Sequence, residues 1–367
     1  MQVTATAQLS KDSDLTILVP TYKRAQLLPS CLLSIAGQSR KDLIKEVIVS
    51  ENSGDAQSRE VASAFSDQLP IRYIQQVEAL TAQQHFIWLV QQVKTKYAAL
   101  ICDDDMWSSY HIEEAMRSFE ENPTIHSFYG QAIVVENATC HPQARYSGSF
   151  LQVPSFTTSE PVDFRVWDRR QTAINCLANT ALNISAVVAL SDALKLAMIT
   201  SAGDPEFGQY PSCDRFLIWR LSLQGDIAIG RNISLFYRGH SGSHTASLHR
   251  DTFHEFCASD LAISKEIARQ ANLLGLNAYE DWQLAYKSFL QHGLATERFD
   301  LWNPMIKDWL LKDQNSDEII PEIHAKRQLH ERLRKYMYLF TPPILGILSQ
   351  KTKRSTLFSK LRNLAKR

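Results

Sequence analysis

From Leu15 onward the chain alternates short apolar runs with stretches of helical spacing, and no other feature of the sequence limits the fold as strongly. Leu15–Val19 is an unbroken apolar run that ends at Pro20, so we expect a buried strand there. Apolar residues at positions 28, 31, 32 and 35 then indicate one buried helix face. Strands that alternate with helices in this way predict βαβ units and a mainly parallel α/β sheet with flanking helices.

The alternation continues to about residue 240. Residues 136–182 have weak periodicity and many Ser, Thr, Pro and Gln, so we expect long loops there. From residue 251 onward only helical patterns occur. We therefore expect a first domain over residues 1–250 and a helical C-terminal region over residues 251–367. The other expected strands are 45–50, 71–75, 97–102, 183–190, 227–229 and 233–237, and the other expected helices are 86–93, 112–119 and one from 191.

Charge and composition exclude several classes of protein. Lys plus Arg and Asp plus Glu both number 39, so no global field attracts nucleic acid, and we expect no nucleic-acid partner. The six cysteines lack the CxxC spacing of a zinc site, and they indicate reduced thiols. No leader pattern is present, and no stretch has the roughly 20 apolar residues of a membrane span. These features favour a cytoplasmic protein.

Three adjacent carboxylates, Asp103, Asp104 and Asp105, directly follow the apolar run that ends at Cys102. In open α/β sheets ligands bind at the carboxyl ends of the strands. If the backbone stays extended, Asp103 and Asp105 point to the same side, and two such carboxylates suit Mg²⁺ or Mn²⁺. A solvated acidic turn that caps the next helix explains the triplet equally well.

Further motifs at matching distances decide between these interpretations. The chain reads Leu-Val-Pro-Thr-Tyr-Lys-Arg over residues 18–24, Glu-Val-Ile-Val-Ser-Glu-Asn-Ser-Gly-Asp over 46–55, and Tyr-Ala-Ala-Leu-Ile-Cys-Asp-Asp-Asp-Met-Trp over 97–107. Over residues 15–245 the order and spacing of these segments resemble the family 2 glycosyltransferases of the GT-A fold. The resemblance implies a nucleotide-sugar-binding α/β domain of Rossmann type and an inverting, metal-dependent sugar transfer.

The resemblance also implies roles for individual residues. Asp103 and Asp105 would hold Mn²⁺ or Mg²⁺ on the diphosphate, with His240 as a further metal ligand. The residues that would contact the donor nucleotide are Pro20, Thr21, Tyr22, Arg24, Glu51, Asp104 and Arg238.

Asp214 matches the aspartate that serves as general base in this family, and it begins an amphipathic run. Removal of a proton from the acceptor hydroxyl requires such a base. Asp is also a good helix N-cap, which is the alternative role. Arg238 can pair with phosphate oxygens through its planar guanidinium, whereas His240 is also compatible with an ordinary surface position.

Several positions depart from the family pattern. Lys23 and His85 stand where asparagine is common, Thr81 where glycine is common, and Cys213 in place of an acid. Glu51 stands where an aspartate usually holds the base, so the nucleotide stays open, with uridine favoured. A scaffold of a polysaccharide-assembly complex without turnover is one alternative. A sugar nucleotidyltransferase is another, although the first turn lacks the glycine-rich phosphate loop of such enzymes.

The C-terminal segment suggests a partner. An apolar run within residues 336–349 precedes residues 351–367, which hold seven Lys or Arg and no acid. Such a segment can lie on an anionic bilayer surface at the inner face of the membrane, or it can be a solvated tail. A membrane location would suit a glycan or lipid-linked acceptor in the synthesis of a cell-surface polysaccharide.

Overall fold

The computed structural model describes residues 14–136, 164–177, 182–202, 214–240, 263 and 266–276. All of them lie in Met1–Phe289, the first of two compact units; the second is Leu290–Arg367. The boundary expected near residue 250 stays a prediction. None of the helices in the described part of the chain is long and apolar enough to cross a membrane. The basic segment 336–367 lies outside the described residues.

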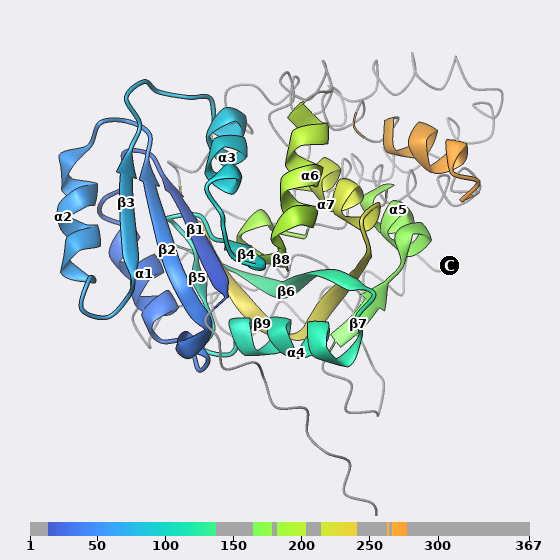
Figure 1. Ribbon diagram of the computed structural model, residues 1–367, viewed down its shortest axis with the longest axis horizontal. Coiled ribbons are helices and arrows are strands. Elements are labelled where there is room, and N and C mark those ends of the chain that lie inside the picture. The colour runs from blue at the N-terminus through green and yellow to red at the C-terminus, as the bar shows by residue number, and fades with distance from the viewer. Residues whose placement is uncertain are drawn as a thin grey trace, which may run out of the picture. The chain divides into compact units, whose positions relative to one another are not determined.

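The described residues form one nine-stranded sheet with the order β3-β2-β1-β4-β8-β6-β9-β5, and β7 pairs with β9 (Figure 1). The strands are β1 (Leu15–Thr21), β2 (Ile44–Glu51), β3 (Ile71–Gln75), β4 (Tyr97–Leu100), β5 (Met106–Trp107), β6 (Ile125–Glu136), β7 (Phe164–Trp167), β8 (Val187–Leu190) and β9 (Asp226–Gly239).

The sheet is parallel in its first half and mixed beyond it. Strands β1 to β4 make only parallel pairs with one another, whereas β8 runs antiparallel to both β4 and β6. β9 is parallel to β6 and antiparallel to β5 and β7. The expected α/β class is therefore confirmed, but the sheet is mixed rather than mainly parallel.

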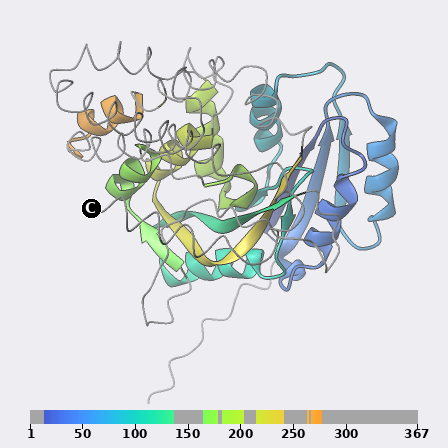
Figure 2. The ribbon, with the colours of Figure 1, turned by 180° about the vertical axis from the view of Figure 1, so that it is seen from behind.

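Helices α1 to α7 flank the sheet, and residues 266–273 are helical as well. Figure 1 shows α4 on one face of the bent strands β6 and β9 and α6 and α7 on the other, and Figure 2 shows the same arrangement from behind. The helices are α1 (Leu28–Ala36), α2 (Ala56–Ala64), α3 (Ala82–Gln91), α4 (His111–Glu121), α5 (Arg169–Leu177), α6 (Ser191–Ala202) and α7 (Asp214–Ser222).

The long loops expected over residues 136–182 are partly wrong, because β7 and α5 lie there. The apolar residues Phe164 and Trp167 of β7 are both buried. Helix α5 has little apolar periodicity, and its buried face includes Thr172 and Asn175, whose side chains bind carbonyls four residues earlier in the chain. Because polar side chains that bind backbone carbonyls can be buried, the buried face of such a helix shows no apolar periodicity from which the helix could be predicted.

Strand β1 positions the first residues of the site. All seven residues of β1 are buried between parallel neighbours β2 and β4. The strand ends at Thr21, whose carbonyl accepts the N–H of Asn52 at 3.0 Å. The carboxyl ends of β1, β2 and β4 therefore meet at one edge of the sheet.

Candidate active site

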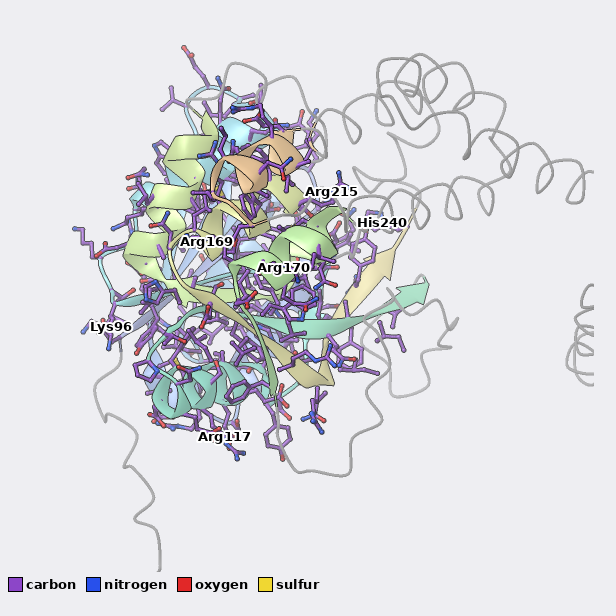
Figure 3. The ribbon with its side chains drawn as sticks, turned by 90° about the vertical axis from the view of Figure 1, so that its right-hand side faces the viewer. Lys96, Arg117, Arg169, Arg170, Arg215 and His240 are labelled. Carbon is purple, nitrogen blue, oxygen red and sulfur yellow. The ribbon has the colours of Figure 1, made fainter. Side chains whose placement is uncertain are left out.

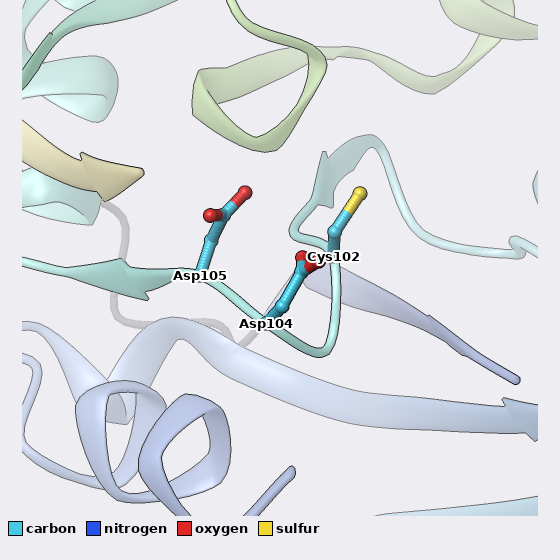
Figure 4. Close-up of side chains that lie close together, drawn as sticks. All are labelled: Cys102, Asp104 and Asp105. Carbon is cyan, nitrogen blue, oxygen red and sulfur yellow. The ribbon is translucent and has the colours of Figure 1, made fainter. Parts of the chain in front are cut away.

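The aspartate triplet lies in a turn beyond the end of β4. The N–H of Asp105 donates to the carbonyl of Cys102 at 3.1 Å, which closes a turn over residues 102–105. The expectation that Asp103 and Asp105 point to the same side assumed an extended backbone, and the turn removes that basis. The side chains that extend together from the turn are instead those of Cys102, Asp104 and Asp105 (Figure 4).

Arg24 neutralises one side of the triplet. Its Nη1 lies 2.7 Å from Asp104 Oδ2 and 3.2 Å from Asp103 Oδ1. The backbone N–H of Tyr22 also points to Asp103, with 3.4 Å between the nitrogen and Oδ2. The turn after β1 and the turn after β4 are thus joined by charge-assisted contacts.

Two residues at the carboxyl end of β9 reach the same turn. His240 Nε2 lies 3.0 Å from Asp104 Oδ2, and the N–H of Arg238 donates to Asp105 Oδ1 at 3.0 Å. Figure 3 shows His240 at the end of β9, away from Arg117 of α4. Residues more than 130 positions apart in the chain therefore converge here.

Two nitrogens of the buried Arg238 guanidinium lack a hydrogen-bond partner among the described residues. Arg238 is 3 % exposed, and its Nε and Nη2 make no hydrogen bond within the described part of the chain. Buried donors of this kind are costly unless a ligand or water satisfies them. An anion with several oxygen acceptors would satisfy both nitrogens at once.

The three carboxyl groups differ in pKa because their surroundings differ. Burial, with the nearby charge of Asp104, raises the pKa of Asp103 to about 6 and that of Asp105 well above its ordinary value. Burial also acts to raise the pKa of Asp104, but the hydrogen bond to His240 and the charge of Arg24 outweigh it and hold that pKa below its ordinary value. Two of the three buried carboxyl groups therefore ionise less readily than usual, and a bound cation would stabilise their charged forms.

The donor atoms of the turn suit a divalent cation. Within the described residues, Cys102, Asp104 and Asp105 form one group whose ligand atoms all lie within 4.8 Å of one another. Two carboxylates are ligands that Mg²⁺ and Mn²⁺ accept. Arg24 and His240 both contact Oδ2 of Asp104, so neither of them occupies Oδ1.

Ser185 holds the turn over residues 102–105 through hydrogen bonds to Cys102 and to nearby Trp107. Its hydroxyl oxygen accepts the N–H of Cys102 at 3.0 Å, and its carbonyl accepts the indole N–H of Trp107 at 2.6 Å. A hydrogen bond from the same hydroxyl lowers the otherwise raised pKa of Asp105. Asn183 in turn holds the N–H of Ser185 through its side chain at 2.8 Å. Neither Ser185 nor Cys102 was among the site residues expected from the sequence.

The expected nucleotide contacts lie at the ends of β1 and β2. Pro20 and Thr21 are buried and pair in register with Ser50 and Glu51. Tyr22 follows directly and is 48 % exposed, so its ring is free of the core. Their contact with a nucleotide stays a prediction.

Glu51 makes contacts that its sequence position did not indicate. Its buried carboxylate accepts the N–H groups of Ser53, Gly54 and Asp55 at distances from 2.6 to 3.0 Å, and also the hydroxyl of Ser53. Gly54 adopts a φ of 80°, which suits glycine. The carboxylate therefore shapes its own loop, and its expected contact with the base stays a prediction.

The departures from the family pattern have local structural explanations. Lys23 has a φ of 54°, a left-handed conformation that asparagine adopts more readily. Thr81 caps α3 through a capping box with Gln84. His85 lies 2.7 Å from the hydroxyl of Ser50 through Nε2, and burial lowers its pKa to about 4. Cys213 lies outside the described residues.

Asp214 is the first residue of α7, whereas the alternative role expected from the sequence was the N-cap, which directly precedes the first helical residue. Burial raises its pKa to about 6, and a backbone hydrogen bond from Ile184 partly opposes this rise. The neighbouring segment also carries Ser185, so one short stretch contacts both Asp214 and the turn of Cys102. A carboxyl with a pKa near 6 is suited to accept a proton near neutral pH.

Comparisons with known proteins agree with this arrangement. Residues 16–165 match the model of the glycosyl transferase family 2. No curated protein matches the chain by sequence.

Solved structures of S. aureus TarS share the fold. The crystal structure of TarS 1–349 has a TM-score of 0.54 at 14% identity and covers 89% of this chain and 91% of that chain. The same fragment in complex with UDP-GlcNAc has a TM-score of 0.50 at 15% identity, covering 76% of this chain and 81% of that one. The longer TarS structure has a TM-score of 0.53 at 14% identity, covering 89% and 55%.

At these identities the likeness to TarS concerns the fold, which is GT-A-like, while the family rests on the segment from β1 to β7. That segment contains the turns of Arg24, Glu51 and Asp103 to Asp105. Residues 16–165 therefore resemble the glycosyl transferase family 2, and this match together with the GT-A-like fold supports a glycosyltransferase.

Proposed function

We propose that the protein transfers a sugar from a nucleotide-diphosphate sugar, with a UDP-sugar favoured, to a hydroxyl of a glycan or lipid-linked acceptor with inversion. The observation that carries the proposal is the convergence of an acidic turn and a buried, unsatisfied Arg238 at the carboxyl edge of the sheet. TarS, whose fold the chain shares, is a protein solved with UDP-GlcNAc, which supports a uridine donor.

The residues on the donor side have separate tasks. A divalent cation, Mn²⁺ or Mg²⁺, would be held by the aspartate turn with His240 beside it, and it would neutralise the diphosphate. Arg238 would bind phosphate oxygens through its unsatisfied Nε and Nη2. Arg24 keeps Asp103 and Asp104 in place, and the exposed ring of Tyr22 would lie against the nucleotide.

Asp214 would act on the acceptor side. It would take the proton of the acceptor hydroxyl as the new bond from that oxygen to the anomeric carbon forms. The bond from the anomeric carbon to the diphosphate breaks in the same step, and the diphosphate leaves with the electron pair. A raised pKa keeps the carboxylate basic enough for this proton transfer.

Release of the nucleoside diphosphate tests the proposal. The full chain is incubated with a panel of nucleotide sugars and Mn²⁺, with and without candidate glycan acceptors, and UDP release is measured. We expect release from at least one UDP-sugar, its loss on chelation, and a decrease of about a hundredfold or more in Asp105→Ala. Asp67→Ala is the matched control, because Asp67 is exposed and distant in sequence from the turn.

No metal-dependent release by the parent from any donor would contradict the proposal and favour a scaffold without turnover. Equal release by the parent and Asp105→Ala would contradict the proposed site. The association of residues 336–367 with an anionic membrane is a separate prediction, which liposome binding by the full chain and a chain ending at residue 335 would test.

A further inference from the structure

Cys102 occupies an unusual place for a free cysteine. It precedes the aspartates in the turn, is partly exposed, and forms no disulfide. Its Sγ lies within 4.8 Å of ligand oxygens of both Asp104 and Asp105. Figure 4 shows the three side chains extending from the same side of the turn.

Three contacts fix the turn that carries this thiol and the carboxylates. The N–H of Cys102 binds the hydroxyl of Ser185, and its carbonyl accepts the N–H of Asp105. Asp105 is fixed again by the N–H of Arg238. These contacts fix the backbone of the turn, from which the side chains of Cys102, Asp104 and Asp105 extend to the same side.

The surroundings point to a ligand in this place. The carboxylates of Asp104 and Asp105 are 6 % and 1 % exposed, and the buried guanidinium of Arg238, whose own N–H holds Asp105, has two unsatisfied nitrogens. A cation among the carboxylates with an anion on Arg238 would satisfy both groups. The imidazole of His240 beside Asp104 adds a nitrogen ligand of intermediate softness.

We infer that Cys102 is a ligand in the proposed metal site and that its sulfur gives the site a preference for thiophilic divalent cations over Mg²⁺. Carboxylate oxygens alone suit Mg²⁺ and Mn²⁺, whereas a thiolate selects softer ions such as Zn²⁺, Co²⁺ and Cd²⁺. On binding, the S–H bond breaks, its proton passes to solvent, and a sulfur–metal bond forms without electron transfer. The inference rests on the proposed function, because it concerns the cation of the same site.

A titration with Cd²⁺ alone tests the sulfur ligand directly. The full chain is titrated with Cd²⁺ and the ultraviolet absorption from sulfur-to-metal charge transfer is followed, with Cys102→Ala and Cys31→Ala as a matched pair. Cys31 is the control because it is a buried cysteine of α1. We expect a saturable band in the parent and in Cys31→Ala and none in Cys102→Ala.

Affinities for the two kinds of cation give a second measurement. We expect Cys102→Ala to weaken Cd²⁺ binding by roughly tenfold or more while Mg²⁺ binding changes much less, since ligand-shell changes typically cost 10–100-fold. Cys102→Asp should raise the affinity for Mg²⁺ relative to Cd²⁺. An equal Cd²⁺ band in Cys102→Ala and the parent would overturn the inference.

Alkylation of the parent chain keeps the test independent of whether the variants fold. Cys102 is treated with iodoacetamide and its modification is followed by peptide mass spectrometry, with Cd²⁺, with Mg²⁺, and after chelation. We expect Cd²⁺ to slow the modification and chelation to restore it, with Mg²⁺ giving weaker protection. No protection by Cd²⁺ would refute the sulfur ligand.

These measurements contain no nucleotide sugar, so they are separate from the test of the proposed function. A Cd²⁺ band at Cys102 without UDP release from any donor would retain the ligand and reject the transfer. Metal-dependent UDP release without a band would retain the transfer and reject the ligand.

Discussion

Arg24 Nη1 lies 2.7 Å from Asp104 Oδ2 and 3.2 Å from Asp103 Oδ1, so one guanidinium faces two buried carboxylates. Arg24 follows β1 and the aspartates follow β4, which are neighbouring parallel strands. The contact therefore joins two turns that the sheet brings to one edge. Arg24 therefore offsets part of the electrostatic cost of burying Asp103 and Asp104, whereas the pKa of Asp105 stays well above its ordinary value because of burial.

Replacement of Arg24 by Gln should destabilise the fold. It leaves Asp103 and Asp104 buried without their shared cation, and breaking a buried ion pair typically costs about 3–5 kcal/mol. The free energy of unfolding, measured by urea denaturation at pH 7, should fall by about 3 kcal/mol. Arg40→Gln is the control, because its partner Asp42 is 57 % exposed, and a loss below about 1 kcal/mol is expected. Equal losses in the two variants would contradict the role of Arg24.

Replacement of Asp214 by Asn should stabilise the fold at neutral pH while it removes transfer. The folded pKa of about 6 lies above the unfolded value of about 3.9, so the folded state binds this proton more tightly. The stability that the proton provides is complete below pH 4 and is lost as pH rises through 6. Asp214→Asn should therefore gain about 1–3 kcal/mol at pH 7.5 and little at pH 4.

The same variant should lose turnover by about a hundredfold or more if Asp214 is the base. In the parent, kcat/KM for UDP release should fall on the acid side with an apparent pKa near 6. Asp67→Asn should change neither stability nor the rate profile. An unchanged rate in Asp214→Asn would leave Asp214 only as the first residue of α7.

His111 should make the fold sensitive to acid. It is fully buried, stacks on Trp107 with ring centroids 4.5 Å apart, and has Nδ1 2.9 Å from the hydroxyl of Ser234. Burial lowers its pKa to about 3, so the stability contributed by the neutral ring is present above about pH 6.5 and is lost as pH falls.

Between pH 7 and pH 4.5 the parent should therefore lose about 2–3 kcal/mol more than His111→Gln. His126→Gln, at a half-buried histidine of β6, should follow the parent. Urea unfolding curves at several pH values measure both. A parallel decline in the parent and His111→Gln would show that His111 is not the group that titrates.

Lys23→Asn should stabilise the protein. Lys23 is the one residue other than glycine with a positive φ among those described, and Asn accepts this conformation at lower cost. We expect a gain of about 0.5–1 kcal/mol in thermal or urea unfolding. Lys94→Asn is the control at an exposed loop lysine without positive φ, and it should change little. A loss of stability in Lys23→Asn would contradict the prediction. It would mean that the contact of the Lys23 amine with the Tyr22 ring, 5.2 Å from its centroid, contributes more to stability than relief of the positive φ.

The expected fold is confirmed for the elements with strong apolar periods. Leu15–Val19 is the centre of β1, and the helix expected from apolar positions 28 to 35 is α1. The expected elements lacked β5, β6, β7, α2 and α5. The apolar sequence Ile-Val-Val of β6 follows His126 and Gln131, which interrupt any simple alternation, and α5 buries polar residues.

For the site, sequence alone located the positions that lie next to strand ends. The turns of Arg24, Glu51 and Asp103 to Asp105 follow β1, β2 and β4, and parallel neighbours end at the same edge. A local pattern of this kind can be read from the sequence because each motif directly follows the apolar run of its own strand. The roles that the resemblance implies for these residues stay predictions.

Only the tertiary structure decided which side chains of that edge face one another. The turn at Cys102 groups this thiol with Asp104 and Asp105 and leaves Asp103 to Arg24, and Ser185 holds the turn from a segment more than 80 residues away. Arg238 and His240 arrive from β9, which pairs with β6 on the far side of β8. Side-chain direction depends on backbone dihedrals and on contacts distant in sequence, whereas strand formation depends on local apolar periodicity. The sequence therefore determined the family resemblance of residues 16–165 and the edge of the sheet where the site residues lie, and the packing of β8 and β9 against β4 and β6 determined the arrangement of the site.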